Sequence, residues 1–208
     1  MLSLQTVLPN TLELLKILTR LPVLSQTRLV GGTALALQYG HRRSVDLDFF
    51  GFATEDVEEL TETLRTSVEK VVRGNCTKRI KVYMLNNVKV DIVTYDYPWI
   101  DDVVVEDGIR LASPKDIAAM KVNAVIGRGT KKDFIDIYYL LKHFSLDELM
   151  ELYLTKYSDG SEYRALLSLT YFDDADPQPM PLMFESVPWE EMKNTIKKAV
   201  EIYNTNHL

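Results

Sequence analysis

The stretch GGTALALQYGHRRSVDLDFF, residues 31–50, decides how the chain is organised. It predicts a tight turn at Gly31-Gly32, followed by a short helix that Thr33 caps. Gly40 stands where that helix should end, because glycine readily adopts the positive φ of a helix C-terminus. From Ser44 the segment SVDLDFF alternates polar and apolar side chains, which is the period of a half-buried β-strand.

Two carboxylates stand on one face of this predicted strand. Side chains alternate along a strand, so Asp46 and Asp48 point to the same side, about 6–7 Å apart. Like charges at that spacing repel unless a cation lies between them. Mg²⁺ suits this position because it takes carboxylate oxygens and keeps water ligands for a substrate phosphate. A solvated strand with two unrelated acids would show the same tripeptide, so the pair alone does not decide.

Three neighbouring features favour the metal site. The glycine turn would let a phosphate approach the backbone and the free N–H groups at a helix start. Asp91 interrupts the apolar strand VKVDIVTY, and an acid there needs solvent, a counter-charge or a metal. Arg42, in the run His41-Arg42-Arg43, could hold a phosphate through two hydrogen bonds. Purely structural explanations remain open for two of these features. The glycines would then only permit a tight turn, and the basic run would only neutralise the nearby acids.

The remaining pattern predicts two lobes. Helices are expected at residues 11–20 and 54–72, and a hairpin of strands 77–85 and 88–95 turns at Asn86-Asn87. From Ser113 the pattern becomes helical, with segments at 114–126, 131–144, 146–157, 162–171 and 189–203. We therefore expect an α+β fold, with a small mixed sheet flanked by helices over residues 1–110 and a helical lobe over residues 111–208.

Composition excludes several classes of protein. Hydrophobic residues are 46% of the 208 and charged residues 26%, as in an ordinary folded domain. Lys and Arg number 24 against 30 Asp and Glu, and the net charge of −6 disfavours a protein that coats nucleic acid through its overall field. No run of 18 apolar residues or signal-peptide pattern occurs, and Cys76 is the single cysteine, so we expect a cytoplasmic protein without a membrane partner.

The helical lobe contains a cluster of basic and acidic residues. Lys121 and Arg128 are two helical turns apart, and Lys132 and Asp136 are four residues apart on the next helix. Asp133 falls in the first turn of that helix, where the helix dipole favours an acid. An ordinary helical hairpin with a solvated face and a Lys132–Asp136 pair accounts for this spacing equally well.

In combination, these segments resemble the AbiEii/AbiGii-type nucleotidyltransferases, a branch of the DNA polymerase β-like superfamily. In that superfamily a Gly-Gly or Gly-Ser turn opens a helix, and an acid pair follows on the next strand, as in residues 31–50. A third acid between apolar residues lies on a later strand, as in Val90-Asp91-Ile92. The cluster from Lys121 to Asp136 resembles the family's later motifs. The resemblance covers most of the chain.

The resemblance implies a polymerase β-like core and a Mg²⁺-dependent enzyme that moves a nucleoside monophosphate from an NTP to an acceptor hydroxyl. Asp46, Asp48 and Asp91 would hold one or two metal ions, and Asp91 would help to deprotonate the acceptor. Lys121, the fourth catalytic candidate, would neutralise the departing pyrophosphate, and the helical lobe would complete the active-site cleft. The candidate nucleotide-binding residues are Gly31, Gly32, Thr33, Arg42, Ser44, Lys121, Arg128, Lys132, Asp133 and Asp136.

The resemblance also implies the toxin of a toxin–antitoxin pair, with an antitoxin protein as partner and tRNA or another RNA as acceptor in some relatives. Two alternatives remain open. One is a catalytically inactive nucleotide-binding or partner-binding module of the same fold, which the acids at all three positions disfavour. The other is a transferase that acts on a small-molecule or protein hydroxyl, which the negative net charge favours over an RNA acceptor.

Overall fold

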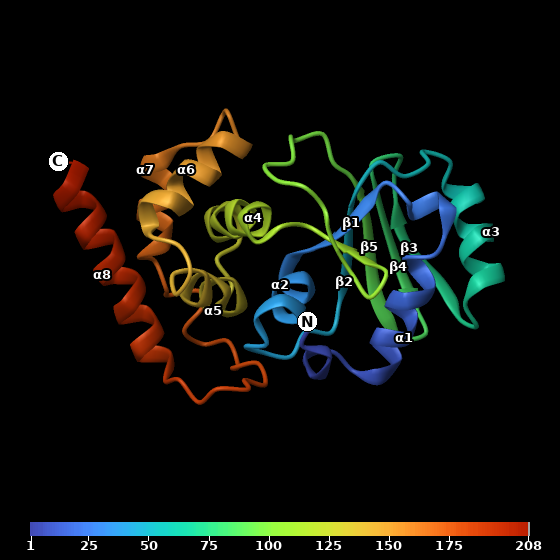
Figure 1. The fold of residues 1–208 in the computed structure, drawn as a ribbon, viewed down its shortest axis with the longest axis horizontal. Coiled ribbons are helices and arrows are strands. Elements are labelled where there is room, and N and C mark those ends of the chain that lie inside the picture. Colours follow the sequence, from blue (N-terminus) through green and yellow to red (C-terminus); the bar gives the residue numbers. More distant parts are fainter. Residues whose placement is uncertain (208) are drawn as a thin grey trace. The chain divides into compact units, whose positions relative to one another are not determined.

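The computed structural model describes residues 1–207, and these form two compact units (Figure 1). Unit 1 comprises Met1–Tyr97 and Asp102–Ala112. Unit 2 comprises Pro98–Asp101 and the chain from Ser113 onward. A four-residue segment of unit 2 thus interrupts unit 1 in the sequence. The domain boundary expected between residues 110 and 111 falls inside strand β7 (Ile109–Leu111).

A mixed β-sheet forms the centre of unit 1. Within residues 1–207 its seven strands lie in the order β3-β4-β5-β2-β1-β7-β6. The pairs β2–β5 and β1–β7 are parallel and the others antiparallel. The strands are β1 (Thr27–Val30), β2 (Leu47–Gly51), β3 (Val71–Cys76), β4 (Ile80–Leu85), β5 (Val88–Thr94), β6 (Val104–Glu106) and β7 (Ile109–Leu111).

Alternation along the central strands β2 and β5 gives this pair of strands one apolar face. Leu47 and Phe49 on β2 and Val90 and Ile92 on β5 are buried, and the ladder pairs Leu47 with Val90 and Phe49 with Ile92. Helices α1 (Pro9–Leu18) and α3 (Val57–Ser67) lie on one side of the sheet and α2 (Gly31–Tyr39) on the other (Figure 1). The residues between the buried positions of β2 and β5 point to the opposite face, where the aspartates lie.

Local signals explain the ends of these elements. Gly40 closes α2 with φ +73°, and Asn86 and Asn87 turn the β4–β5 hairpin with φ of 48° and 65°, as predicted. The predicted cap of α2 was wrong: the helix begins at Gly31 and its N-cap is Val30, so Thr33 lies inside the first turn. The helix expected over residues 54–72 ends earlier, at Ser67. The β-branched residues Val71 and Val72 favour an extended backbone, and they begin the edge strand β3.

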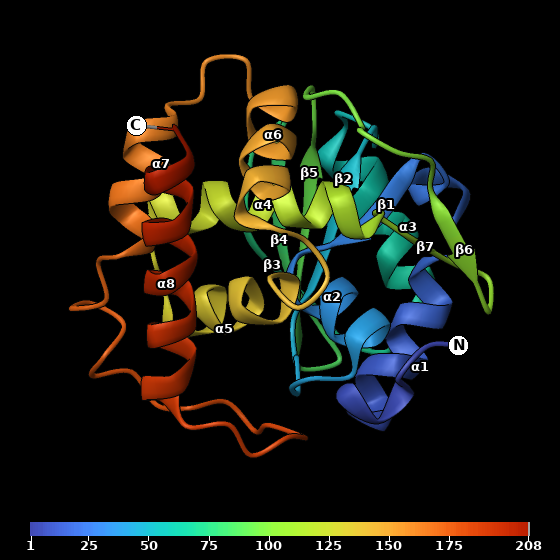
Figure 2. The same ribbon diagram turned by 60° about the vertical axis from the view of Figure 1, so that its left-hand side comes forward.

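Unit 2 is helical. Helix α4 packs against α5, α6 and α7, and α8 packs against the same three (Figure 2). A tilted Phe134–Phe172 ring pair, with centroids 4.7 Å apart, is part of the aromatic packing in this unit. No helix within residues 1–207 is long and apolar enough to cross a bilayer. The helices are α4 (Pro114–Gly127), α5 (Lys131–Leu140), α6 (Leu146–Lys156), α7 (Glu162–Leu169) and α8 (Trp189–His207). The expected α+β fold is confirmed.

Candidate active site

Two of the predicted carboxylates lie side by side on the sheet. Asp48 on β2 is the ladder partner of Asp91 on the parallel strand β5. Ladder partners share a face of the sheet, so both side chains project from the face opposite the apolar core. Asp46 directly precedes β2, and all three aspartates are half-buried. The register therefore places two acids from segments more than 40 residues apart next to each other.

A lysine contacts one of these acids. Lys89 Nζ lies 2.6 Å from Asp91 Oδ2. The Asp91 carboxylate, with smaller contributions from the charges of Asp48 and Asp46, raises the pKa of Lys89 above its ordinary value although partial burial opposes this. The second oxygen, Asp91 Oδ1, is buried and has no hydrogen-bond partner among the described residues. A buried acceptor without a partner is costly, so this oxygen is suited to receive a cation or a proton.

The glycine turn leads directly to the acids. Gly31 follows β1 with φ +68°, and a Cβ built on it would lie 2.7 Å from Asp48 Oδ2. A Cβ on Gly32 would collide with Nη2 of Arg42. The position of Gly31 therefore favours glycine through both its positive φ and the nearby carboxylate, and a side chain at Gly32 would have to displace the Arg42 guanidinium. This start also carries the free N–H groups and positive dipole end of the helix.

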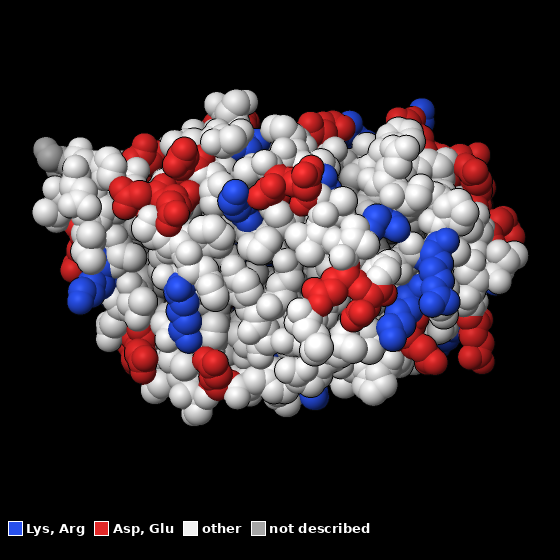
Figure 3. All heavy atoms as spheres, viewed as in Figure 1, with Lys and Arg blue, Asp and Glu red and all other residues white. Residues whose placement is uncertain are grey.

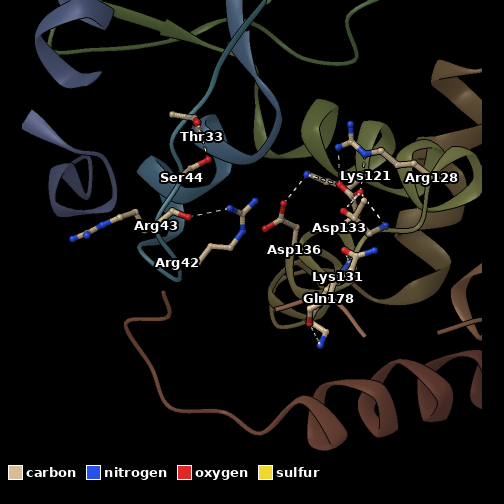
Figure 4. Close-up of polar contacts among 11 residues, drawn as sticks. Thr33, Arg42, Arg43, Ser44, Lys121, Arg128, Lys131, Asp133, Asp136 and Gln178 are labelled. Atoms are coloured by element: carbon tan, nitrogen blue, oxygen red, sulfur yellow. Dashed lines mark hydrogen bonds and ion pairs between the residues drawn. The ribbon is translucent and has the colours of Figure 1, made fainter. Parts of the chain in front are cut away.

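The predicted polar residues around this turn are mostly engaged within the protein (Figure 4). Thr33 Oγ1 lies 2.8 Å from Ser44 Oγ and also hydrogen-bonds the carbonyl oxygen of Asp46. Both hydroxyls are buried, so they connect α2 to the segment that carries the acid pair. Arg42 is only 2% exposed, and its Nη1 donates to the carbonyl oxygen of Arg43 at 3.1 Å. It places a buried positive charge beside Gly32.

The residues of this face suit Mg²⁺ by donor type. Hard divalent cations prefer carboxylate oxygens, and Asp48 and Asp91 supply them from adjacent strands. The unpartnered Oδ1 of Asp91 could act as one such ligand oxygen. As the side chains stand within residues 1–207, no three His, Cys, Asp or Glu groups are close enough to enclose an ion. Binding would therefore need rotation of these carboxylates, and rotation of Asp91 would also disturb the contact of its Oδ2 with Lys89.

The cluster predicted in unit 2 is a buried ion network (Figure 4). Lys121 Nζ on α4 lies 3.0 Å from Asp133 Oδ1 and 2.6 Å from Asp136 Oδ2 on α5. The Lys121 side chain is 5% exposed and the two acids at most 1%. Arg128 contacts Asp133 through Nε at 2.8 Å and Nη2 at 2.9 Å, with its own side chain 64% exposed. The network joins the two helices.

Asp133 is the centre of this network. Burial alone would raise its pKa, but the hydrogen bond from Arg128, the charge of Lys121 and the hydrogen bond from Thr130 outweigh burial and hold the pKa of Asp133 well below its usual range. Thr130 Oγ1 donates to Asp133 Oδ2 at 2.6 Å in a capping box that starts α5. Asp133 is therefore ionised at neutral pH.

Lys132 lies apart from the network. It is exposed, and the expected alternative pairing of Lys132 with Asp136 is wrong, because Lys121 takes Asp136. Its neighbour Lys131, which the sequence pattern did not single out, is buried. Lys131 Nζ donates to the carbonyl oxygen of Asp176 at 3.1 Å and lies 5.2 Å from the Trp189 ring centroid. No spacing signal distinguishes Lys131 from Lys132; only the packing of α5 against α8 does.

Surface charge is mixed. On the face drawn in Figure 3, acidic and basic side chains lie in small groups with uncharged surface between them. Phosphate contacts on that face would therefore depend on individual side chains rather than on a broad basic surface.

Comparison with known proteins assigns the chain. A family model described as "Nucleotidyl transferase AbiEii toxin, Type IV TA system" matches residues 13–202. The chain belongs to this AbiEii family. An uncharacterized protein of Aquifex aeolicus (strain VF5), aq_aa25, is 33% identical over 203 residues, which cover 93% of this chain and 96% of that protein. Membership identifies the chain as a nucleotidyltransferase, as the resemblance implied.

Solved structures confirm the polymerase β-like fold of this AbiEii protein. A candidate nucleotidyltransferase of Helicobacter pylori has a TM-score of 0.65 at 22% identity, with 98% of this chain and 95% of that chain covered. MenT4, a nucleotidyltransferase toxin of Mycobacterium tuberculosis H37Rv, has a TM-score of 0.55 at 15% identity, with 90% and 83% covered. At these identities the likeness supports the fold alone.

Proposed function

We propose that this AbiEii-family enzyme transfers a nucleoside monophosphate from a nucleoside triphosphate to an acceptor hydroxyl, with Mg²⁺ held by Asp46, Asp48 and Asp91. The observation that supports this most strongly is the ladder pairing of Asp48 with Asp91, one oxygen of which is buried without a partner. Gly31, at the start of α2, also adjoins the Asp48 carboxylate.

The transfer exchanges one phosphorus–oxygen bond for another. The acceptor oxygen attacks the α-phosphorus, the bond from the α-phosphorus to the α–β bridging oxygen breaks, and pyrophosphate leaves with that electron pair. The acceptor proton goes to a carboxylate oxygen, and Asp91 Oδ1 is our candidate because nothing else within the described residues bonds it. Bound Mg²⁺ would offset the negative charge on the phosphates.

The protein's other contributions are positioning and charge. Without Cβ atoms at Gly31 and Gly32, a phosphate can approach the N–H groups at the start of α2 closely. The buried guanidinium of Arg42 beside Gly32 supplies a fixed positive charge there. Thr33 and Ser44 hold the Asp46 segment against α2, so we assign them a positioning role.

The cluster of unit 2 receives no chemical step in this proposal. Two carboxylates hold the ammonium of Lys121, and Asp133 also holds Arg128. The contact of Lys121, Arg128, Lys132, Asp133 and Asp136 with a nucleotide stays a prediction. Its test, given in the Discussion, separates a stabilising role of Lys121 from a catalytic one.

Family membership supports candidates for the acceptor and the biological partner. Membership supports a toxin whose effect an antitoxin counteracts, with an NTP as donor and an RNA as a candidate acceptor. The net charge of −6 favours instead a small-molecule or protein hydroxyl. Incubation with each α-³²P-labelled NTP and separate RNA, protein and metabolite fractions decides between them, because the label stays on the acceptor.

The decisive variants are Asp48→Asn and Asp91→Asn. Each keeps the size of the side chain and removes the charge, so label transfer should fall by on the order of 10²–10³ or more while the melting temperature stays close to that of the wild type. Asp107→Asn in the β6–β7 turn is the matched control, because Asp107 is exposed and asparagine also accepts its φ of 54°. Near wild-type transfer by Asp48→Asn would disprove the assignment.

A further inference from the structure

Lys89 lies inside the proposed carboxylate site. It precedes Asp91 by two residues on β5, so both side chains leave the same face of the sheet. Its Nζ is 2.6 Å from Asp91 Oδ2, and its side chain is 46% exposed. The ladder pair Leu47–Val90 places residue 46 at the level of residue 89 on the neighbouring strand, and Asp48 stands opposite Asp91. Lys89 thus lies on the same face as Asp91 and Asp48, one step along the strands from that pair and level with Asp46.

Lys89 and a metal ion would use the same carboxylate group, that of Asp91. A carboxylate oxygen that accepts a hydrogen bond from an ammonium at 2.6 Å is a weaker ligand for a second cation on the same side. Like charges separated by a few ångströms also repel, even at the high effective dielectric of a half-exposed site. The lysine stem is flexible and partly in solvent, so the ammonium can move away when a stronger cation arrives.

We propose that Lys89 is the internal counter-ion of the carboxylate site and competes with the divalent cation for Asp91. The inference rests on the proposed function, since it takes Asp46, Asp48 and Asp91 as the metal ligands. Its consequence is that the protein binds a divalent cation weakly by itself. A bound triphosphate, with its own negative charges, offsets the repulsion between Lys89 and the metal, so metal and nucleotide bind with positive cooperativity.

The test measures metal binding without turnover. Mn²⁺ is titrated into the 208-residue protein without nucleotide at constant ionic strength, and free Mn²⁺ is followed by electron paramagnetic resonance. Lys89→Met should bind Mn²⁺ about five- to tenfold more tightly than the wild type, which corresponds to ~1–1.4 kcal/mol. Lys89→Arg keeps the charge and should bind like the wild type. Lys78→Met is the control for net charge, because Lys78 is exposed and its ion pair with Glu55 is long, at 4.0 Å. The Mn²⁺ affinity of this variant should differ little from that of the wild type.

Each other outcome contradicts a specific claim. Equal or weaker Mn²⁺ binding by a folded Lys89→Met protein would overturn the competition, and weaker binding would make Lys89 a residue that positions Asp91. If Asp48→Asn binds Mn²⁺ as tightly as the wild type, the proposed metal site is wrong, whatever the result for Lys89→Met. If neither the wild type nor Lys89→Met binds Mn²⁺, both claims fail. Melting curves of every variant show whether it is folded.

Discussion

Gly32 illustrates how the absence of one side chain shapes the candidate site. A Cβ at this position would collide with the guanidinium of Arg42, which is buried and also bonded to the Arg43 carbonyl. Substitution must therefore move Arg42 away from the start of α2. The same glycine lies in a helix, where alanine is intrinsically better by about 0.5–1 kcal/mol, so the collision and the propensity act in opposite directions on stability.

We predict that Gly32→Ala weakens triphosphate binding more than it destabilises the fold. The displaced guanidinium removes a fixed positive charge, while the helix gains propensity, so the melting temperature should change by only a few degrees. Calorimetric titration with a triphosphate, beside a melting curve, measures both. Gly127→Ala at the end of α4 is the control, because a Cβ there meets nothing within 4 Å. Unchanged affinity in a folded Gly32→Ala protein would remove the turn from the site.

At the scale of elements, the α4–α5 pair depends on Lys121. Its ammonium is buried between Asp133 and Asp136, and neither acid is more than 1% exposed. Removal of one partner leaves buried carboxylates less well compensated, which typically costs about 3–5 kcal/mol. Lys121→Met should therefore lower the free energy of unfolding strongly in urea denaturation. Lys132→Met, at an exposed lysine in the first turn of α5, should change it by no more than about 0.5 kcal/mol.

This expectation differs from the one that the sequence supports. If Lys121 were an exposed side chain that faces a triphosphate, its removal would reduce turnover and leave the melting temperature unchanged. Because Lys121 is buried, we expect its removal to lower the melting temperature instead of leaving it unchanged. A Lys121→Met protein that melts like the wild type but has lost activity would restore the catalytic assignment, and our structural interpretation would then be wrong.

The same pair predicts a pH dependence. The pKa of Asp133 is held below its usual range, so the ionised form is stabilised in the folded protein relative to the unfolded chain. This stabilisation is fully present above the unfolded pKa of about 4 and is lost as the pH falls towards the folded value. The urea midpoint of the wild type should therefore decrease below about pH 4. Asp133→Asn should show a smaller decrease over that range; an identical slope would exclude this contribution.

Local patterns predicted the sequence-adjacent parts of the site, and packing decided the rest. The glycine turn, the Asp46–Asp48 strand and the interrupted strand at Asp91 are visible because period-2 alternation and turn chemistry act over a few residues. The ladder pairing of Asp48 with Asp91 adds a register that spacing alone does not contain. Strands β6 and β7 were missed although Asp107-Gly108, both with positive φ, is a typical hairpin turn.

Helix α5 shows why a face assignment can fail. The pattern suggested one apolar and one solvated face, but every residue from Asp133 to Leu140 is buried. The helix packs against both α4 and α8, so its polar side chains had to find partners inside the unit. Lys121 for Asp136 and the Asp176 carbonyl for Lys131 are such partners. Partners on other helices cannot be read from spacing within one helix.

At the scale of the whole molecule, the chain passes through unit 2 before it completes unit 1. The short segment Pro98–Asp101 belongs to unit 2, and a buried ion pair holds it there. Asp116 accepts hydrogen bonds from the amides of Ile100 at 2.9 Å and Asp101 at 3.3 Å. Lys156 Nζ donates to Asp116 Oδ1 and to the carbonyl oxygen of Pro98, both at 2.7 Å. Neither charged side chain is exposed.

Lys156→Met should therefore both destabilise unit 2 and release this segment. The methionine keeps the volume of the stem but leaves the Asp116 carboxylate buried without its ammonium, which should lower the free energy of unfolding by about 3–5 kcal/mol. Hydrogen exchange gives the local measurement: the amides of Ile100 and Asp101, which Asp116 bonds, should exchange faster than in the wild type. Lys115→Met is the matched control, because Lys115 is half exposed and pairs with Asp101 at 3.1 Å, so its loss should cost at most about 1 kcal/mol. If the two variants lose equal stability, or if the two amides keep their protection in Lys156→Met, the buried pair does not hold the segment.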